Sequence, residues 1–152
     1  MDVLYYWKDF DKDMKAKRIG WLASDRKKMG DMRAAYPDHI WALRTPPGRK
    51  GEVELIACMK WTDAPTVPVP RVEAQSVIFY DPNHEESRRF IESDTDERIK
   101  EISSLIRSEF PQAFSANFRG DNAVQPMRGD FLLRFRKTAE TFPSQAFLQE
   151  AA

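Results

Sequence analysis

The sequence has few of the side chains that bind metals or form disulfides: one cysteine and two histidines among 152 residues. A single cysteine excludes an intramolecular disulfide and a multi-cysteine metal site. Cys58 falls within a predicted strand, where we expect a buried thiol. The histidines, His39 and His84, are not spaced to form a metal-binding pair with an acidic residue on a predicted helix. Because a nucleotide-binding fingerprint is also missing, we expect no metal and no cofactor.

Long apolar runs and an excess of one charge sign are missing too. No segment approaches the ~18 apolar residues of a membrane span, and the N-terminus lacks the apolar core of a signal peptide. We therefore expect a cytoplasmic protein without a membrane partner. Basic and acidic side chains number 24 each, but residues 1–60 carry 13 basic and 9 acidic ones. The neutral total allows a mildly basic N-terminal surface, although ordinary solvation explains the asymmetry equally well.

The central stretch, residues 38–63, has the pattern of two strands joined by a turn. In residues 39–45 a strand would place Trp41 and Leu43 on one face and Ile40 and Ala42 on the other. The prolines and glycines between residues 46 and 51 break the pattern. From Val53 to Trp61 every second side chain is apolar again, while the opposite face is only partly polar. Such mixed faces favour a curved sheet or small barrel over a flat, half-solvated sheet.

Short strands and helices flank this hairpin. Predicted strands cover residues 3–7, 72–80 and 123–125, with a brief apolar insert at residues 19–23. Predicted helices cover residues 25–35, 85–91 and 95–108, and a last helix starts at Gly129 or Asp130. Residues 8–18 are densely charged and indicate a loop or a poorly amphipathic helix. We therefore predict one α+β domain over residues 1–152, with a strongly bent, mostly antiparallel sheet or small β-barrel flanked by helices.

The tryptophans and most tyrosines lie early in the chain: all four tryptophans fall within the first 61 residues, together with three of the four tyrosines. They either fill a barrel core or wall a pocket for a flat ring, with basic side chains holding phosphates. If the aromatics wall a pocket, the predicted helix start near residues 24 and 25 would offer backbone N–H donors or a carboxylate to the edge of the base. The base-binding candidates are Tyr6, Trp7, Trp21, Ser24, Asp25 and Trp41. The phosphate-binding candidates are Arg26, Lys28, Arg44, Arg49 and Lys50.

Three stretches together carry a family resemblance over about residues 3–136. They are the aromatic strand Leu4–Trp7, the hairpin with IWALRT and GEVELIACMKW, and the segment RGDNAVQPM at 119–127 before a helix. In this order they resemble the PUA-like superfamily and, within it, the EVE-type domains, in which an arginine, a short strand and VQP precede the last helix. The resemblance implies a PUA-like bent sheet that binds modified bases in DNA or RNA.

The predicted function is therefore a non-enzymatic reader module that binds a base, unpaired or flipped out, in an aromatic pocket beside the central hairpin. Two alternatives stay open. Near-zero net charge favours a protein-interaction or defence-associated accessory module, whose exposed aromatics would contact a protein partner. A nuclease like some ASCH relatives of the fold would need a lysine, a tyrosine or a carboxylate to converge on one pocket.

Overall fold

The structure is a computed structural model that describes residues 1–24, 27–69 and 76–148. Its strands are β1 (Asp2–Tyr6), β2 (Trp21–Ser24), β3 (His39–Arg44), β4 (Glu54–Thr62), β5 (Ser76–Asp81), β6 (Arg88–Phe90), β7 (Val124–Met127) and β8 (Ser144–Ala146). Its helices are α1 (Phe10–Lys15), α2 (Lys27–Ala34), α3 (Asp96–Glu109), α4 (Pro111–Ser115) and α5 (Gly129–Glu140), with a 3-10 turn, η1, at Gly120–Ala123.

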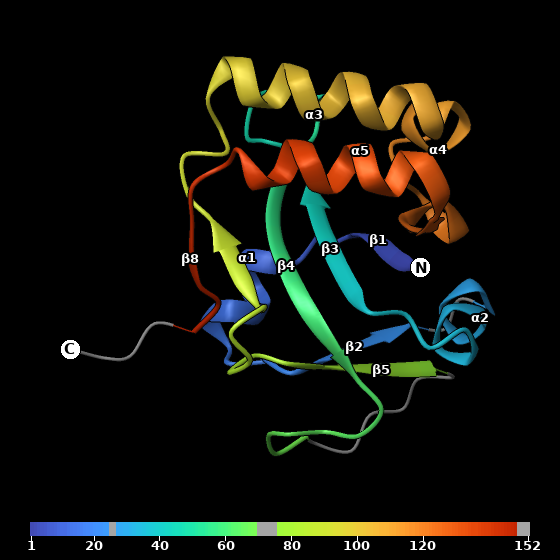
Figure 1. The fold of residues 1–152 in the computed structure, drawn as a ribbon, viewed down its shortest axis with the longest axis vertical. Helices are drawn as coiled ribbons and strands as arrows, with labels where there is room; N and C mark the ends of the chain where they lie inside the picture. The colour runs from blue at the N-terminus through green and yellow to red at the C-terminus, as the bar shows by residue number, and fades with distance from the viewer. Residues whose placement is uncertain (25–26, 70–75, 149–152) are drawn as a thin grey trace.

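The strands form a strongly curled mixed sheet with the order β2-β5-β4-β3-β1-β7, and β6 and β8 extend it from β4. Among the described strands, β1 and β3 pair in parallel and the other pairs are antiparallel. Figure 1 shows β4 as a long, bent strand that runs from the layer of α3 and α5 to the level of β2 and β5. The predicted α+β class with a bent, mostly antiparallel sheet is confirmed as a half-barrel flanked by helices.

The curl of the sheet follows from the way β4 changes partners along one edge. Its end, Lys60–Thr62, pairs with β5, whereas Ala57 and Cys58 pair with β6. On its other edge β4 forms the predicted hairpin with β3, with a register shift between Ala42 and Leu43. Such a shift bends a strand and increases its twist. The central hairpin is therefore both the longest ladder and the place where the sheet turns.

Both faces of the sheet are covered, which explains the mixed polarity of the hairpin strands. On one face, Trp41 and Leu43 pack with buried residues of α3 and α5. On the other, Ile40 and Ala42 pack with Trp7 and with buried residues of α2 and β5. Figure 1 shows α3 and α5 lying together across the first face. Strands buried on both faces carry near-continuous apolar runs, as β4 does.

One predicted helix is wrong, because residues 85–91 contain the strand β6 and not a helix. Arg88–Phe90 lies between β4 and β8 and hydrogen-bonds with both. The turn before it is closed by the buried Ser87, whose Oγ donates to the Asp81 carbonyl at 2.5 Å and accepts from the Lys60 amide at 2.9 Å. These long-range bonds satisfy the backbone here better than a short charged helix would. The apolar insert at residues 19–23 likewise contains a strand, β2.

Candidate functional site: an aromatic cleft between β1 and β2

A cleft of about 320 Å³ lies where the chain leaves β1 and returns to the sheet at β2. Its aromatic walls are Tyr5, Tyr6, Trp7 and Trp21, and its charged side chains are Lys8, Asp9, Asp13 and Arg18. We call it the aromatic cleft. Three of the predicted base-binding residues, Tyr6, Trp7 and Trp21, therefore line one cleft. That volume is within the range of small-molecule sites, which begins at roughly 300 Å³.

The aromatic residues of this cleft differ in how much surface they offer. Trp7 is 1% exposed, and its Nε1 donates to Asp13 Oδ2 at 2.8 Å, so it forms a fixed floor. Tyr6 is half-buried, and its hydroxyl and Thr45 Oγ1 share a hydrogen bond of 2.6 Å. Trp21 is half-buried at the first position of β2, where it pairs with Phe79. Tyr5, Tyr6 and Trp21 are therefore the partly exposed rings of the cleft, and one face of Tyr6 is covered by Phe118.

The fold of residues 8–18 decides which charged side chains beside the cleft are paired and which are exposed. Asp13 lies 3.6 Å from Arg18 and also holds Trp7, while Asp11 accepts from Arg44 at 2.9 Å. The lysines of the same segment are exposed. Two of the three acids of this segment, Asp11 and Asp13, thus contact other side chains, whereas its lysines are exposed to water. The exposed surface of the segment is therefore basic, although acidic and basic residues alternate in its sequence. Lys8 and Arg18 extend that basic surface to the rim of the cleft.

A second cleft, of about 350 Å³, adjoins the aromatic cleft because both include Tyr6 and Lys8 in their walls. Its other side chains come from the segment before β7, chiefly Phe118 and Arg119. We call it the η1 cleft. It places the segment that resembles the arginine and VQP of EVE-type domains beside the first strand.

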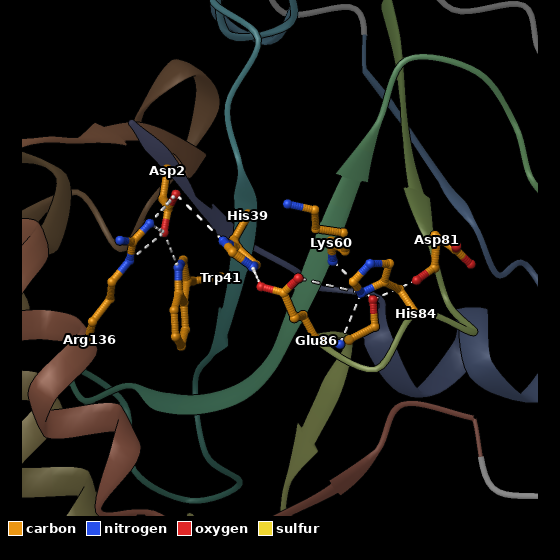
Figure 2. Close-up of polar contacts among 9 residues, drawn as sticks. Asp2, His39, Trp41, Lys60, Asp81, His84, Glu86 and Arg136 are labelled. Atoms are coloured by element: carbon orange, nitrogen blue, oxygen red, sulfur yellow. Dashed lines mark hydrogen bonds and ion pairs between the residues drawn. The ribbon is translucent and has the colours of Figure 1, made fainter.

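Trp41, the remaining aromatic candidate, belongs to a third cleft of about 390 Å³ on the α5 side of the sheet, which we call the His39 cleft. Figure 2 shows its polar chain, in which Asp2 lies among Arg136, Trp41 and His39, and Glu86 lies between His39 and His84. Trp41 Nε1 donates to Asp2 Oδ2 at 2.8 Å. Arg136 donates to both Asp2 oxygens at 2.9 Å. Trp41 is only 8% exposed.

The Asp2 carboxylate is the buried charge that organises this chain. Burial alone would raise the pKa of Asp2, but His39, Trp41 and Arg136 lower it, and the net pKa lies below its ordinary value. His39 Nε2 is 3.1 Å from Glu86 Oε1, whereas its Nδ1 is 3.9 Å from Asp2 Oδ1. Asp2 on β1 thus contacts side chains of β3 and of α5. We interpret this arrangement as a structural connection between the sheet and α5.

Cys58 also lines the His39 cleft, and it is buried as the sequence predicts. Burial raises the pKa of its thiol above the ordinary value. A thiol with a raised pKa holds little thiolate near neutral pH and is a poor nucleophile. The Cys58 thiol is therefore a poor candidate for a nucleophile.

Most predicted phosphate contacts are engaged elsewhere. Arg44 donates to the buried Glu54 at 2.5 Å and Arg49 contacts Asp96 at 2.8 Å. Lys28 donates to Gln125 at 2.9 Å; burial lowers its pKa, and the charge of Asp121 opposes this. Lys50 is exposed and lines none of the three clefts.

The predicted helix start is only partly described. Ser24 ends β2 opposite Ser76. Asp25 and Arg26 lie outside the described residues. Lys8 and Arg119 reach the clefts but are absent from the predicted phosphate-binding set. A signal for Lys8 was present, because the acids of residues 8–18 alternate with lysines and a fold that pairs the acids leaves the lysines exposed.

Comparison with known proteins returned no matching family model, no matching curated protein and no matching solved structure. The resemblance to EVE-type domains therefore stays a prediction. None of the described helices has the length and apolar character needed to cross a membrane. Within residues 1–24, 27–69 and 76–148, no three His, Cys, Asp or Glu side chains are grouped so that they would hold a metal ion.

Proposed function

We propose that this protein is a nucleic-acid reader that binds one unpaired or flipped-out base of DNA or RNA, with a modified base as the preferred ligand, in the aromatic cleft. The observation that carries the proposal is the meeting of three half-buried rings, Tyr5, Tyr6 and Trp21, with two exposed cations in one cleft. The cations are Lys8 and Arg18. A flat ring needs aromatic faces, and its phosphate needs a nearby positive charge.

The energetics favour a cleft with more than one ring. Taking a base out of a stack costs a few kcal/mol, and stacking on an aromatic side chain returns about 1–3 kcal/mol. One ring would barely balance the cost. Contact with both Tyr6 and Trp21, together with hydrogen bonds to the base edge, exceeds it. Trp7 supports this indirectly, because its hydrogen bond to Asp13 holds the floor of the cleft in place.

The acidic side chains in the cleft narrow the class of base. Carboxylates accept hydrogen bonds from an exocyclic amine, which cytosine, adenine and guanine carry on their base-pairing edges and thymine and uracil lack. Asp9 is exposed in the cleft wall, and Asp13 is already held by Trp7 and Arg18. Asp9 is thus the side chain we assign to the base edge, and an amine-bearing base is the preferred class.

The test is a titration of the full chain with short single-stranded oligonucleotides that carry cytosine, methylcytosine or hydroxymethylcytosine, at two salt concentrations. We expect Trp21→Ala to lower the affinity roughly 5- to 150-fold, as the loss of one stacking face of about 1–3 kcal/mol requires. Tyr36→Ala is the matched control, because Tyr36 is an aromatic residue that is 73% exposed and lies outside the aromatic cleft. Absence of binding at low salt, or equal effects of both variants, would refute the proposal.

A second candidate function has its own observation in its favour. Lys8, Tyr6 and Asp9 line the same cleft, which is the convergence of lysine, tyrosine and carboxylate that a nuclease would need. Incubating a labelled single strand with the protein, with and without Mg²⁺, separates the two functions. Cleavage that Lys8→Ala abolishes would favour the nuclease, whereas intact oligonucleotide recovered from a stable complex favours the reader.

A further inference from the structure

The aromatic cleft and the η1 cleft share Tyr6 and Lys8, so a ligand longer than one nucleotide can extend from one into the other. The ridge between them is rigid. The Tyr6 ring stacks on Phe118 at 5.3 Å with an interplanar angle of 2°, and the Tyr6 hydroxyl is held by Thr45. Phe118 is itself 4% exposed. A strand crossing this ridge would meet a surface that does not need to reorganise on binding.

Three cations follow the same line. Arg18 lies in the aromatic cleft, Lys8 lies in both clefts, and Arg119 lies in the η1 cleft. All three are exposed. Arg18 is 3.6 Å from Asp13, whereas Lys8 and Arg119 form no ion pair within the part of the chain that the structure describes. Charges without a protein partner are the ones available to a phosphate.

The backbone that presents Arg119 has an unusual conformation. Asn117 and Phe118 have positive φ angles of 52° and 57°, and Gly120 has one of 61°. Residues with side chains adopt this region at a cost of order 1 kcal/mol or more each and persist there when surrounding contacts impose it. Hydrogen bonds from the amides of Phe118 and Arg119 to the carbonyls of Ala113 and Ala116, at 2.9 and 3.2 Å, impose it here.

We infer that the ligand is a single strand of at least two nucleotides, whose base occupies the aromatic cleft and whose backbone crosses Tyr6 so that adjacent phosphates contact Lys8 and Arg119. This inference rests on the proposed function and specifies its ligand: a free nucleoside would fill the aromatic cleft but leave Lys8 and Arg119 without a phosphate. It also replaces Arg44 and Arg49 as phosphate contacts, since those side chains already bind carboxylates.

The experiment compares the wild-type chain with Arg119→Gln and Lys8→Gln, using a short single strand and the same strand with one neutral methylphosphonate linkage beside the bound base. Lys50→Gln is the matched control, because Lys50 is exposed and lines neither cleft. Each cleft variant should lower the affinity for the charged strand roughly 3- to 10-fold and reduce the salt slope by about 0.7 to 1. On the neutral strand, at least one of the two should bind like the wild type, and Lys50→Gln should match the wild type on both strands.

The outcomes distinguish failure of the proposed reader function from failure of the proposed strand path. If no strand binds the wild-type chain, both the reader and the strand path fail. If Trp21→Ala abolishes binding but both cleft variants bind the charged strand like Lys50→Gln, the strand path is wrong and the reader stands. A loss caused by Arg119→Gln and Lys8→Gln that is equally large on charged and neutral strands also overturns the inference, because neither side chain would then act through the phosphate. A duplex of the same sequence that binds with the same affinity as the single strand would contradict the inference that the ligand is single-stranded.

Discussion

The aromatic cleft and the His39 cleft have similar volumes and each has a tryptophan whose N–H donates to an aspartate, yet the cations beside them differ in exposure. In the His39 cleft the buried Asp2 binds Arg136 and Trp41. In the aromatic cleft the indole N–H of Trp7 likewise donates to an aspartate, Asp13, but Lys8 and Arg18 remain exposed at the rim. The charges around Asp2 thus connect strand and helix, whereas Lys8, which forms no ion pair with the described residues, lies exposed beside the rings of the aromatic cleft and is available to a ligand.

The largest effect on the His39 cleft should come from Asp2→Ala. Removing the carboxylate leaves the buried Trp41 N–H without an acceptor and Arg136 without its partner. We expect a loss of about 3 kcal/mol in the free energy of unfolding, the low end for a broken buried pair, since Arg136 is partly exposed and water can solvate it. Urea unfolding measures the loss. Asp31→Ala, an exposed aspartate, is the control and should change the stability by no more than about 0.5 kcal/mol.

Replacing each tryptophan by phenylalanine sharpens the comparison. Trp41→Phe removes a hydrogen bond to a buried charge, and we expect it to cost about 2 kcal/mol of unfolding free energy while oligonucleotide affinity stays unchanged. Trp21→Phe should leave stability within about 1 kcal/mol and lower the affinity instead. If Trp41→Phe lowers the affinity more than Trp21→Phe does, the roles assigned to the two clefts are reversed.

The pH dependence of stability tests the charge on Asp2. The folded-state pKa is lowered, so the stability contributed by Asp2 is fully present above the unfolded pKa near 3.9 and is lost as the pH falls through the folded pKa. We expect the difference in unfolding free energy between the wild type and Asp2→Asn to be constant above about pH 5 and to shrink below about pH 4. A difference that grows on acidification would contradict this charge assignment.

The smallest effect should come from Glu86→Gln. Glu86 is half exposed where it meets His39, and exposed ion pairs contribute about 0–1 kcal/mol. We therefore expect a loss of at most about 0.5 kcal/mol and no change in oligonucleotide affinity. A loss as large as that of Asp2→Ala would show that the whole chain from Asp2 to His84 acts as one cooperative network.

The fold was largely predictable because its main elements have strong local patterns. The hairpin of β3 and β4 has two runs of apolar residues separated by a Pro-Gly turn, and α3 has the buried stripe of Ile99, Ile102 and Ile106. Residues 85–91 were mispredicted because β6 is only three residues long and is held by partners distant in sequence. Short strands of this kind carry little local information.

The site was predictable only as a set of residue types. Sequence pattern shows that Trp7, Trp21 and Trp41 are candidates, but not that Trp7 and Trp41 give their indole N–H groups to Asp13 and Asp2. Arg44 and Arg49 looked available because most acids that bind them are distant: Asp11, Glu54 and Asp96 lie 10 to 47 positions away in the chain, and only Glu52 lies close to Arg49. Ion pairs between residues distant in sequence decide which charges remain exposed, and the periodicity of the sequence does not predict such pairs.

The most direct test of the aromatic cleft is a ¹H–¹⁵N spectrum of the four tryptophan indole N–H groups, assigned with single Trp→Phe variants, during titration with a short single strand at low salt. We expect the Trp21 signal to shift most, the Trp7 signal to shift less because its N–H stays on Asp13, and the Trp41 signal to stay in place. A largest shift at Trp41 or Trp61, or no shift at any of the four, would contradict binding in the aromatic cleft.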